Sequence, residues 1–206
     1  MVPVGPFSKP GQQTDLSAFF NVFENRKFRS AAFGYFGHMW ELYAFWAFVP
    51  VMLKTYSLEH PQTTFNIPIV SFLIIGIGGL ACALGGYLSE RFGTKRIAFI
   101  ALGLSCSCCF ISPLVFTSEF DNVFIGFLLF WGMVVIAVSP LLSTLVAQNA
   151  SAEIKGTALT IVNCIGFSIT IISIQLITVL IELTASNSIY TILAIGPVLG
   201  LIALSW

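Results

Sequence analysis

The feature that most constrains this chain is a succession of six long apolar blocks joined by short connections. Each block has 18 to 25 residues, and a helix needs about 20 apolar residues to cross the hydrocarbon core of a bilayer. Strands of a membrane barrel would instead alternate polar and apolar residues over about 10 residues. Because lipid offers the backbone no hydrogen-bond partners, we expect all six blocks to be helices. The predicted spans are residues 31–53, 67–88, 97–116, 123–147, 157–181 and 189–206.

The composition supports a protein that lies in a lipid bilayer. Only 9% of the 206 residues are charged and 57% are hydrophobic, whereas soluble domains average about 25% charged residues. So few charges cannot cover a surface that faces water. The net charge of zero gives no indication of nucleic-acid binding. The sequence therefore predicts an all-α, polytopic membrane protein with six transmembrane helices.

The basic residues predict the orientation of the chain. Six spans place both termini on the same side of the membrane, and Lys54 is the only basic residue expected on the other side. An excess of Lys and Arg marks cytoplasmic segments, so we expect both termini to be cytoplasmic. The basic residues on the side of the termini are Lys9, Arg26, Lys27, Arg29, Arg91, Lys95, Arg96 and Lys155.

Residues 1–30 precede the first span and differ from it in composition. The first 15 are rich in Pro, Gly and polar residues, and "DLSAFFNVFENRKF" at 15–28 places its large apolar residues on one helical stripe. This pattern predicts a short amphipathic helix, which either lies at the cytoplasmic interface of the membrane or packs on another protein segment.

Two of the short connections contain glycine and charged residues in specific patterns. The first is "GGYLSERFGTKR" at 85–96, in which Gly86 can allow close helix packing and Gly93 can permit the tight turn. Its acidic and basic side chains, Glu90 and Arg91, can bond to helix ends. The second is "AEIKGTA" at 152–158. The residues that define the two patterns are Gly86, Glu90, Arg91, Gly93 and Lys95 in the first, and Glu153, Lys155 and Gly156 in the second.

The two loops, together with "GYFGHMWELYAFW" in the first block and residues 146–167, resemble the second half of major facilitator superfamily transporters. Members have twelve helices in two six-helix halves, each built from two inverted three-helix repeats. The resemblance implies a C-terminal half, preceded over residues 1–30 by the cytoplasmic linker, in a bacterial inner membrane. The N-terminal six-helix half is missing, and a separate half or a second copy of the chain would have to complete the transporter. In the family, the first loop pattern stabilises one access state.

The first block is the only one that contains a charged residue, Glu41, and it also contains His38 one helical turn away. An ionisable residue within a membrane span is costly and indicates a functional site. The resemblance places this helix at the central cavity. We therefore hypothesise that Glu41 is a proton-coupling carboxylate and that His38 tunes it or touches the substrate. The alternative is that Glu41 and His38 form a structural contact between helices.

Three further residues are candidates for contact with a solute. Tyr35 flanks the face of His38, Trp40 lies near the middle of its span and could stack on a substrate, and Asn163 lies within the fifth span. Structural alternatives remain for two of them, because Trp is common at membrane interfaces and a buried Asn can bond to the backbone.

The leading interpretation is proton-coupled transport of a small solute by alternating access. The alternative is a membrane scaffold without transport activity, or a truncated remnant that lacks the N-terminal half. The sequence contains no nucleophile–base spacing, metal-ligand cluster or phosphate-binding loop, so we expect neither an enzyme nor a bound cofactor or metal.

Overall fold

The computed structural model of the chain describes residues 23–184 and 186–206. The helix predicted over residues 15–28 therefore lies mostly outside the described residues. Residues 23–25 form a turn, and Asn25 caps the first described helix by accepting hydrogen bonds from the backbone N–H groups of Lys27 and Phe28. Such a cap satisfies backbone donors that have no partner within the helix.

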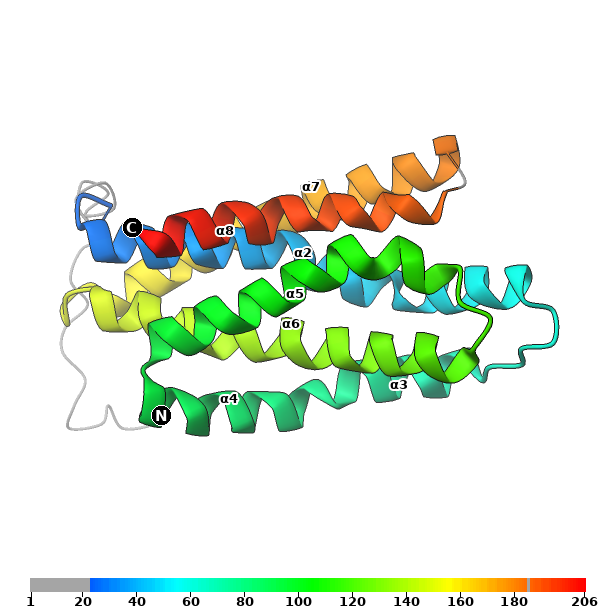
Figure 1. Cartoon of the computed structure of the whole chain (residues 1–206). Coiled ribbons are helices and arrows are strands. Elements are labelled where there is room, and N and C mark those ends of the chain that lie inside the picture. Colours follow the sequence, from blue (N-terminus) through cyan, green and yellow to red (C-terminus); the bar gives the residue numbers. More distant parts are fainter. Residues whose placement is uncertain (1–22, 185) are drawn as a thin grey trace, which may run out of the picture.

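The described residues are almost entirely helical and contain no strand. The long elements run antiparallel to one another along a single bundle, and the beginning of the first and the end of the last lie at the same end (Figure 1). This confirms the predicted all-α fold of one six-helix half. The elements are α2 (Arg26–Glu59), α3 (Ile67–Gly76), α4 (Gly78–Phe92), α5 (Thr94–Phe116), α6 (Asp121–Asn149), α7 (Lys155–Thr184), η1 (Asn187–Ala194) and α8 (Ile195–Ser205).

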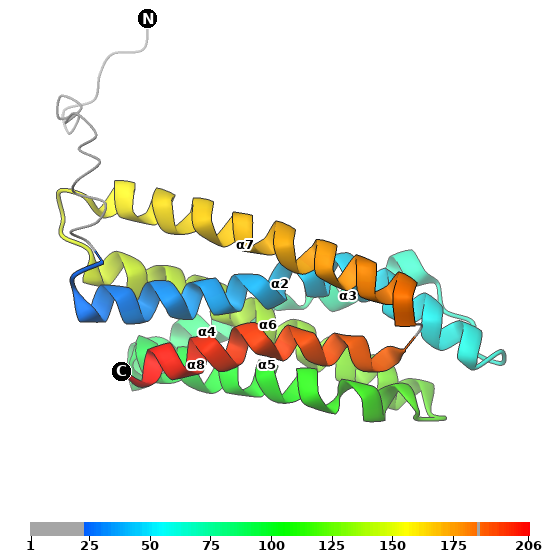
Figure 2. The ribbon, with the colours of Figure 1, turned by 90° about the horizontal axis from the view of Figure 1, so that it is seen from above.

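Within the described residues, five helical stretches are long and apolar enough to cross a membrane. They are α3 with α4, then α5, α6 and α7, and finally η1 with α8. Helix α2 is longer than any of them but is not apolar enough to meet the same criterion. Its position explains the difference, because α2 packs against α6, α7 and α8 in the middle of the bundle. Figure 2 shows α2 between α7 and α8.

Small residues permit the close contact of α2 with α8. A Cβ atom at Gly37 would collide with the carbonyl oxygen of Gly196, and one at Gly200 would lie 3.2 Å from the carbonyl oxygen of Gly34. Membrane helices have no hydrophobic driving force between them, so close backbone packing of this kind holds them together.

Two apolar core clusters follow one another along the bundle. One contains Tyr35 and Met39 of α2 and packs near the end where α2 begins. The other contains Phe45 of α2 and Trp131 of α6 and extends to the opposite end. The α2 residues from position 40 to 41 belong to neither cluster, so the middle of α2 is where the two clusters meet.

The second and the sixth predicted spans are each divided in the structure. The second is broken at Ile77, between α3 and α4, and the sixth begins as the 3₁₀ helix η1 before it continues as α8. Gly76, Gly78 and Gly79 surround Ile77 and lower the helix propensity there. At this break α6 comes close, because a Cβ atom at Gly132 would lie 2.5 Å from the carbonyl oxygen of Ile74.

Candidate functional site

The carboxyl group of Glu41 lies fully buried at the middle of the bundle and is held by donors from two neighbouring helices. Its Oε1 accepts hydrogen bonds from Ser105 Oγ at 2.5 Å and from Trp131 Nε1 at 2.7 Å. Cys109 Sγ donates to the same oxygen at 3.3 Å. Ser105 and Cys109 are one turn apart on α5, and Trp131 lies on α6, so this single oxygen connects α2 with both helices.

The second oxygen of the same carboxyl group has no such partner. Glu41 Oε2 is buried and makes no hydrogen bond to any residue that the structure describes. No ion pair is found between the described residues, so no cation neutralises the carboxyl group. A buried, uncompensated negative charge is very unfavourable. A proton on Oε2 would remove that charge, and the site can therefore hold a proton at this atom.

His38 is also fully buried, and it is not the hydrogen-bond partner of Glu41. Neither Nδ1 nor Nε2 of its ring has a partner within residues 23–184 and 186–206. Its nearest ring neighbour is Tyr35, edge-on, with 6.4 Å between the ring centroids. Glu41 and His38 thus share one side of α2, but the structure ties Glu41 to α5 and α6 and leaves the imidazole unpaired.

The structure places the three candidate solute contacts at separate positions. Tyr35 is buried against α7, where its ring would lie 2.9 Å from a Cβ atom at Gly166. Asn163 is half-buried on α7, three residues before Gly166, and its amide forms no hydrogen bond with another described residue. Trp40 is half-buried on another side of α2 and donates from Nε1 to the carbonyl oxygen of Ile192 at 3.2 Å. These residues therefore do not form one cluster with Glu41.

Trp40 does line a groove. Its volume is about 470 Å³, and its walls come from α2, from Ile169 of α7 and from the apolar face of α8. The groove is almost wholly apolar, with Phe36 and Leu199 among its walls. A groove of this size and lining can accommodate an apolar or aromatic part of a molecule.

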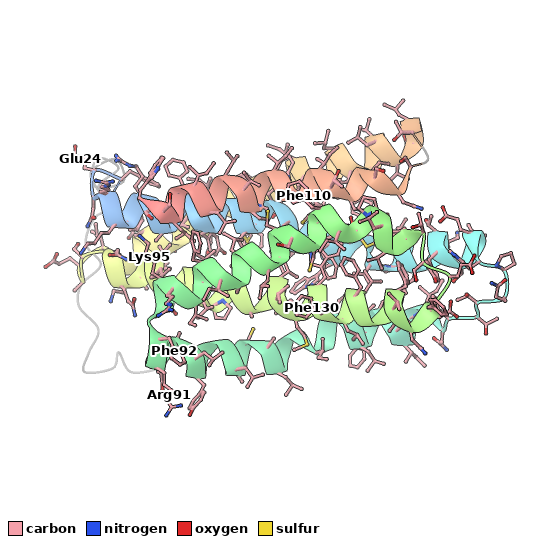
Figure 3. All side chains as sticks on the ribbon, viewed as in Figure 1. Glu24, Arg91, Phe92, Lys95, Phe110 and Phe130 are labelled. Atoms are coloured by element: carbon pink, nitrogen blue, oxygen red, sulfur yellow. The ribbon has the colours of Figure 1, made fainter. Side chains whose placement is uncertain are left out.

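The first loop pattern lies at the end of the bundle where α2 begins. Gly93 has φ 90°, a conformation that favours glycine, and it joins α4 to α5 as predicted. Glu90 and Arg91 are exposed, and the Arg91 guanidinium lies over the ring of Tyr87, 5.8 Å from its centroid. Figure 3 shows Arg91 pointing away from the bundle at the end of α4. Gly86 was expected to permit close helix packing, but a Cβ atom there would have no neighbour within 4 Å, so it has no such role within this bundle.

The second loop pattern lies at the beginning of α7. Glu153 and Lys155 are exposed, and a Cβ atom at Gly156 would meet nothing within 4 Å. In both loop patterns the charged side chains are therefore accessible and form no ion pair with the described parts of the chain.

Sequence reasoning missed the three residues that hold Glu41. Ser105, Cys109 and Trp131 are not among the candidate residues that the sequence pattern indicated. A signal was present, because Ser105 and Cys109 are four residues apart and so lie on the same face of a helix. Nothing in the sequence showed that this face turns towards Glu41.

The fold and the site together define a helical integral membrane protein with a polar group at the centre of its bundle. The family model of the Major Facilitator Superfamily matches residues 3–174, and the chain belongs to this family. Its members are membrane transporters and not enzymes, and the chain is about half their usual length. A comparison with curated proteins finds no match to the chain.

Proposed function

We propose that the chain is the C-terminal half of a secondary transporter that moves a small solute by alternating access, coupled to protons. A second six-helix half, or a second copy of this chain, would complete the solute site between the two halves. The end of the bundle with Arg26 and Trp206 would face the cytoplasm of a bacterial inner membrane. The excess of basic residues at that end supports this orientation.

The observation that carries the proton-coupling proposal is the environment of Glu41. It is the one carboxylate that is buried in the described part of the chain, and no cation accompanies it. A membrane protein that needed only a contact between α2, α5 and α6 could use neutral residues there. A carboxyl group adds the ability to gain and lose a proton within the bundle.

The hydrogen bonds of Glu41 give a physical link between protonation and helix packing. Bonds to a carboxylate are roughly twice as strong as bonds between neutral groups. Loss of the proton from Oε2 would strengthen the bonds from Ser105 and Trp131 to Oε1, and binding of a proton would weaken them. Protonation of Glu41 would thereby shift how firmly α2 is held by α5 and α6, which is what coupling to a conformational change requires.

His38 would act as the second proton-carrying group of the site. Its two unpaired ring nitrogens lie one helical turn from Glu41, and imidazole changes charge near neutral pH when it has access to water. Opening of the bundle around α2 would provide that access. Tyr35, which touches the His38 ring edge-on, and Asn163 would lie on the route to the solute, and Trp40 would bind an apolar part of the solute in its groove.

The exposed charged residues of the two loop patterns would act between the halves. Glu90, Arg91 and Lys95 at one loop, and Glu153 and Lys155 at the other, are available for ion pairs with the second half in one access state. Such pairs would break in the other state, so they would set the balance between the two.

The experiment that tests the architecture is the size of the native protein in membranes of its own cells. An antibody against the loops at 85–96 and 152–158 would detect either a band at about 22.4 kDa or one near twice that mass. The larger band, or a 22.4 kDa band that copurifies with a second six-helix chain, supports the proposal. A 22.4 kDa chain without any six-helix partner, and without association of its own copies, would overturn it.

A further inference from the structure

A second cavity lies at the end of the bundle where α2 begins, whereas Glu41 lies at the middle of the bundle. Its volume is about 700 Å³, and its walls come from the first turn of α2, the start of α5 and the ends of α6 and α8. These four segments meet because α2 and α5 begin at the end of the bundle where α6 and α8 finish (Figure 1). The cavity is thus a feature of the folded bundle and not of one helix terminus.

Among the described residues, the lining of this cavity includes three cations and no acidic residue. Arg26 and Lys27 come from α2 and Lys95 from α5, and all three side chains are exposed to the cavity mouth. None of them forms an ion pair with a residue in the described ranges. Figure 3 shows Lys95 at the same end of the bundle as Glu24, but Glu24 is not part of the lining.

The uncharged polar residues of the lining hold the helices around the cavity together by hydrogen bonds. Asn25 Nδ2 donates to the carbonyl oxygen of Asn149 at 3.4 Å, which ties the start of α2 to the end of α6. Ser30 Oγ donates to the carbonyl oxygen of Ala203 at 2.7 Å, which ties α2 to α8. These amide and hydroxyl groups already bond to one another or to backbone, whereas the three cations have no ion-pair partner among the described residues of the lining.

The rest of the lining is apolar. Leu145, Leu204 and Trp206 form a wall from α6 and α8, with Ala31 of α2 opposite. A cluster of cations beside an apolar wall, between helix ends at the membrane surface, matches a ligand with an anionic group and an apolar body. Phosphate offers several acceptor oxygens, so it can bond to an Arg and two Lys at once.

We propose that this cavity binds a phosphate group, carried either by the headgroup of an acidic phospholipid or by a free phosphate compound. The cations hold the phosphate oxygens, and the wall with Leu204 and Trp206 covers the glycerol and the first methylenes of a lipid. Binding there clamps α2, α5, α6 and α8 together at one end of the bundle. The proposal does not depend on solute transport or on Glu41.

The test uses the 206-residue chain, reconstituted with equal amounts of phosphatidylglycerol and phosphatidylcholine. After extraction in mild detergent, native mass spectrometry counts the lipids that each chain retains. Each Lys or Arg close to an anionic headgroup contributes about fivefold in affinity. We expect one retained phosphatidylglycerol per chain, and a loss of affinity of about 30-fold in the double variant Arg26→Gln/Lys95→Gln.

The matched control is Arg96→Gln/Lys155→Gln, which removes the same two charge types from residues that do not line the cavity. It should retain the lipid as the unchanged chain does. Should Arg26→Gln/Lys95→Gln fail to fold, the single variant Lys27→Gln serves in its place, with an expected loss of about fivefold. Equal retention of both lipids by the unchanged chain, or an equal loss in both double variants, would overturn the proposal.

A second arm distinguishes the two sources of phosphate. Inorganic phosphate at millimolar concentration is added to the chain that retains phosphatidylglycerol. Displacement of the lipid from both the unchanged chain and the control variant, whose cavity is intact, assigns the site to free phosphate compounds as well. Continued retention of the lipid assigns it to the phospholipid.

Discussion

Helix α2 and the pair α3–α4 are consecutive in the chain and both pack against α6, but they differ in hydropathy and in burial. The stretch Ile67–Phe92 has the highest mean hydropathy of the five apolar stretches, 2.4, yet only five of its residues are buried. Helix α2 is less apolar and contains Glu41 and His38, yet most of its middle is buried. The large side chains that α3–α4 exposes include Ile69, Phe72, Leu73, Leu80 and Leu84.

This difference shows that the hydropathy of a helix in such a fold depends on what surrounds the helix. Lipid or a neighbouring membrane helix accepts apolar side chains on the surface that it covers, so α3–α4 can be both highly apolar and exposed in this bundle. Helix α2 is surrounded by protein, so its composition is free to include polar groups that neighbouring helices satisfy. Helix α2 can therefore contain polar groups because neighbouring helices bury it and supply their hydrogen-bond partners.

The largest effect is expected where α2 crosses α8. Gly37→Ala places a methyl group against the carbonyl oxygen of Gly196, and the two backbones must separate. We expect a loss of about 3 kcal/mol in the free energy of unfolding, measured by SDS titration in detergent micelles. The control is Gly79→Ala in α4, where the new methyl group meets nothing within 4 Å. An equal effect of both substitutions would contradict the close α2–α8 contact.

The next effect concerns the polar centre of α2. Glu41→Leu removes the acceptor of Ser105, Cys109 and Trp131 and leaves these buried donors unpaired, so we expect a loss of about 2 kcal/mol in stability. Glu41→Gln keeps a carbonyl oxygen for the same donors, and its loss should stay below about 1 kcal/mol. Thermal unfolding in micelles measures both. If Leu were tolerated as well as Gln, the hydrogen bonds would not hold α2 to α5 and α6.

A smaller effect is expected at the point where α4 packs on α6. A Cβ atom at Gly78 would collide with the side chain of Ile136 and lie 2.7 Å from its Cβ atom, so α4 has to shift slightly away from α6. Gly78→Ala should therefore cost about 1 kcal/mol. Gly86→Ala, two turns further along α4 and without a neighbour within 4 Å, should be neutral or slightly stabilising in the same SDS titration. A loss at Gly86 as large as that at Gly78 would mean that α4 is oriented differently.

The smallest effect is expected on the exposed side of α4. Leu80 is 68% exposed, so truncation in Leu80→Ala removes contacts with lipid or detergent and not with the protein core. The free energy of unfolding should change by less than about 0.5 kcal/mol. Leu102→Ala on α5, where the leucine is fully buried, is the matched control and should cost at least about 2 kcal/mol. Similar losses at the two positions would show that α4 is covered by protein.

The sequence predicted the number and approximate position of the helices because bilayer thickness sets the length of an apolar block. It did not predict that α2 extends from Arg26 to Glu59, since polar residues at a helix end carry no hydropathy signal. The break at Ile77 was also missed. Glycines weaken a helix, but whether it breaks depends on a neighbour such as α6, which the sequence of α3–α4 does not contain.

The candidate site, like the fold, could be predicted only in part from the sequence. Glu41 and His38 could be found from the sequence because ionisable residues within spans are rare. Their partners could not, because the rotation of α5 and α6 about their own axes decides which faces meet α2. Trp40 and Glu41 are adjacent on α2 but contact different helices, because Trp40 bonds to Ile192 and Glu41 bonds to Ser105 and Trp131. Successive residues of a helix point in directions about 100° apart, so neighbours in sequence reach different helices.

Proton coupling through Glu41 is tested by measuring proton movement through the complete transporter. The chain, together with its six-helix partner, is reconstituted into liposomes that contain a pH-sensitive dye, and a panel of small solutes is presented outside. We expect a solute-dependent change of internal pH that is lost in Glu41→Gln and kept in Glu59→Gln, a carboxylate exposed at the end of α2. Solute uptake that remains coupled to protons in Glu41→Gln would contradict the account.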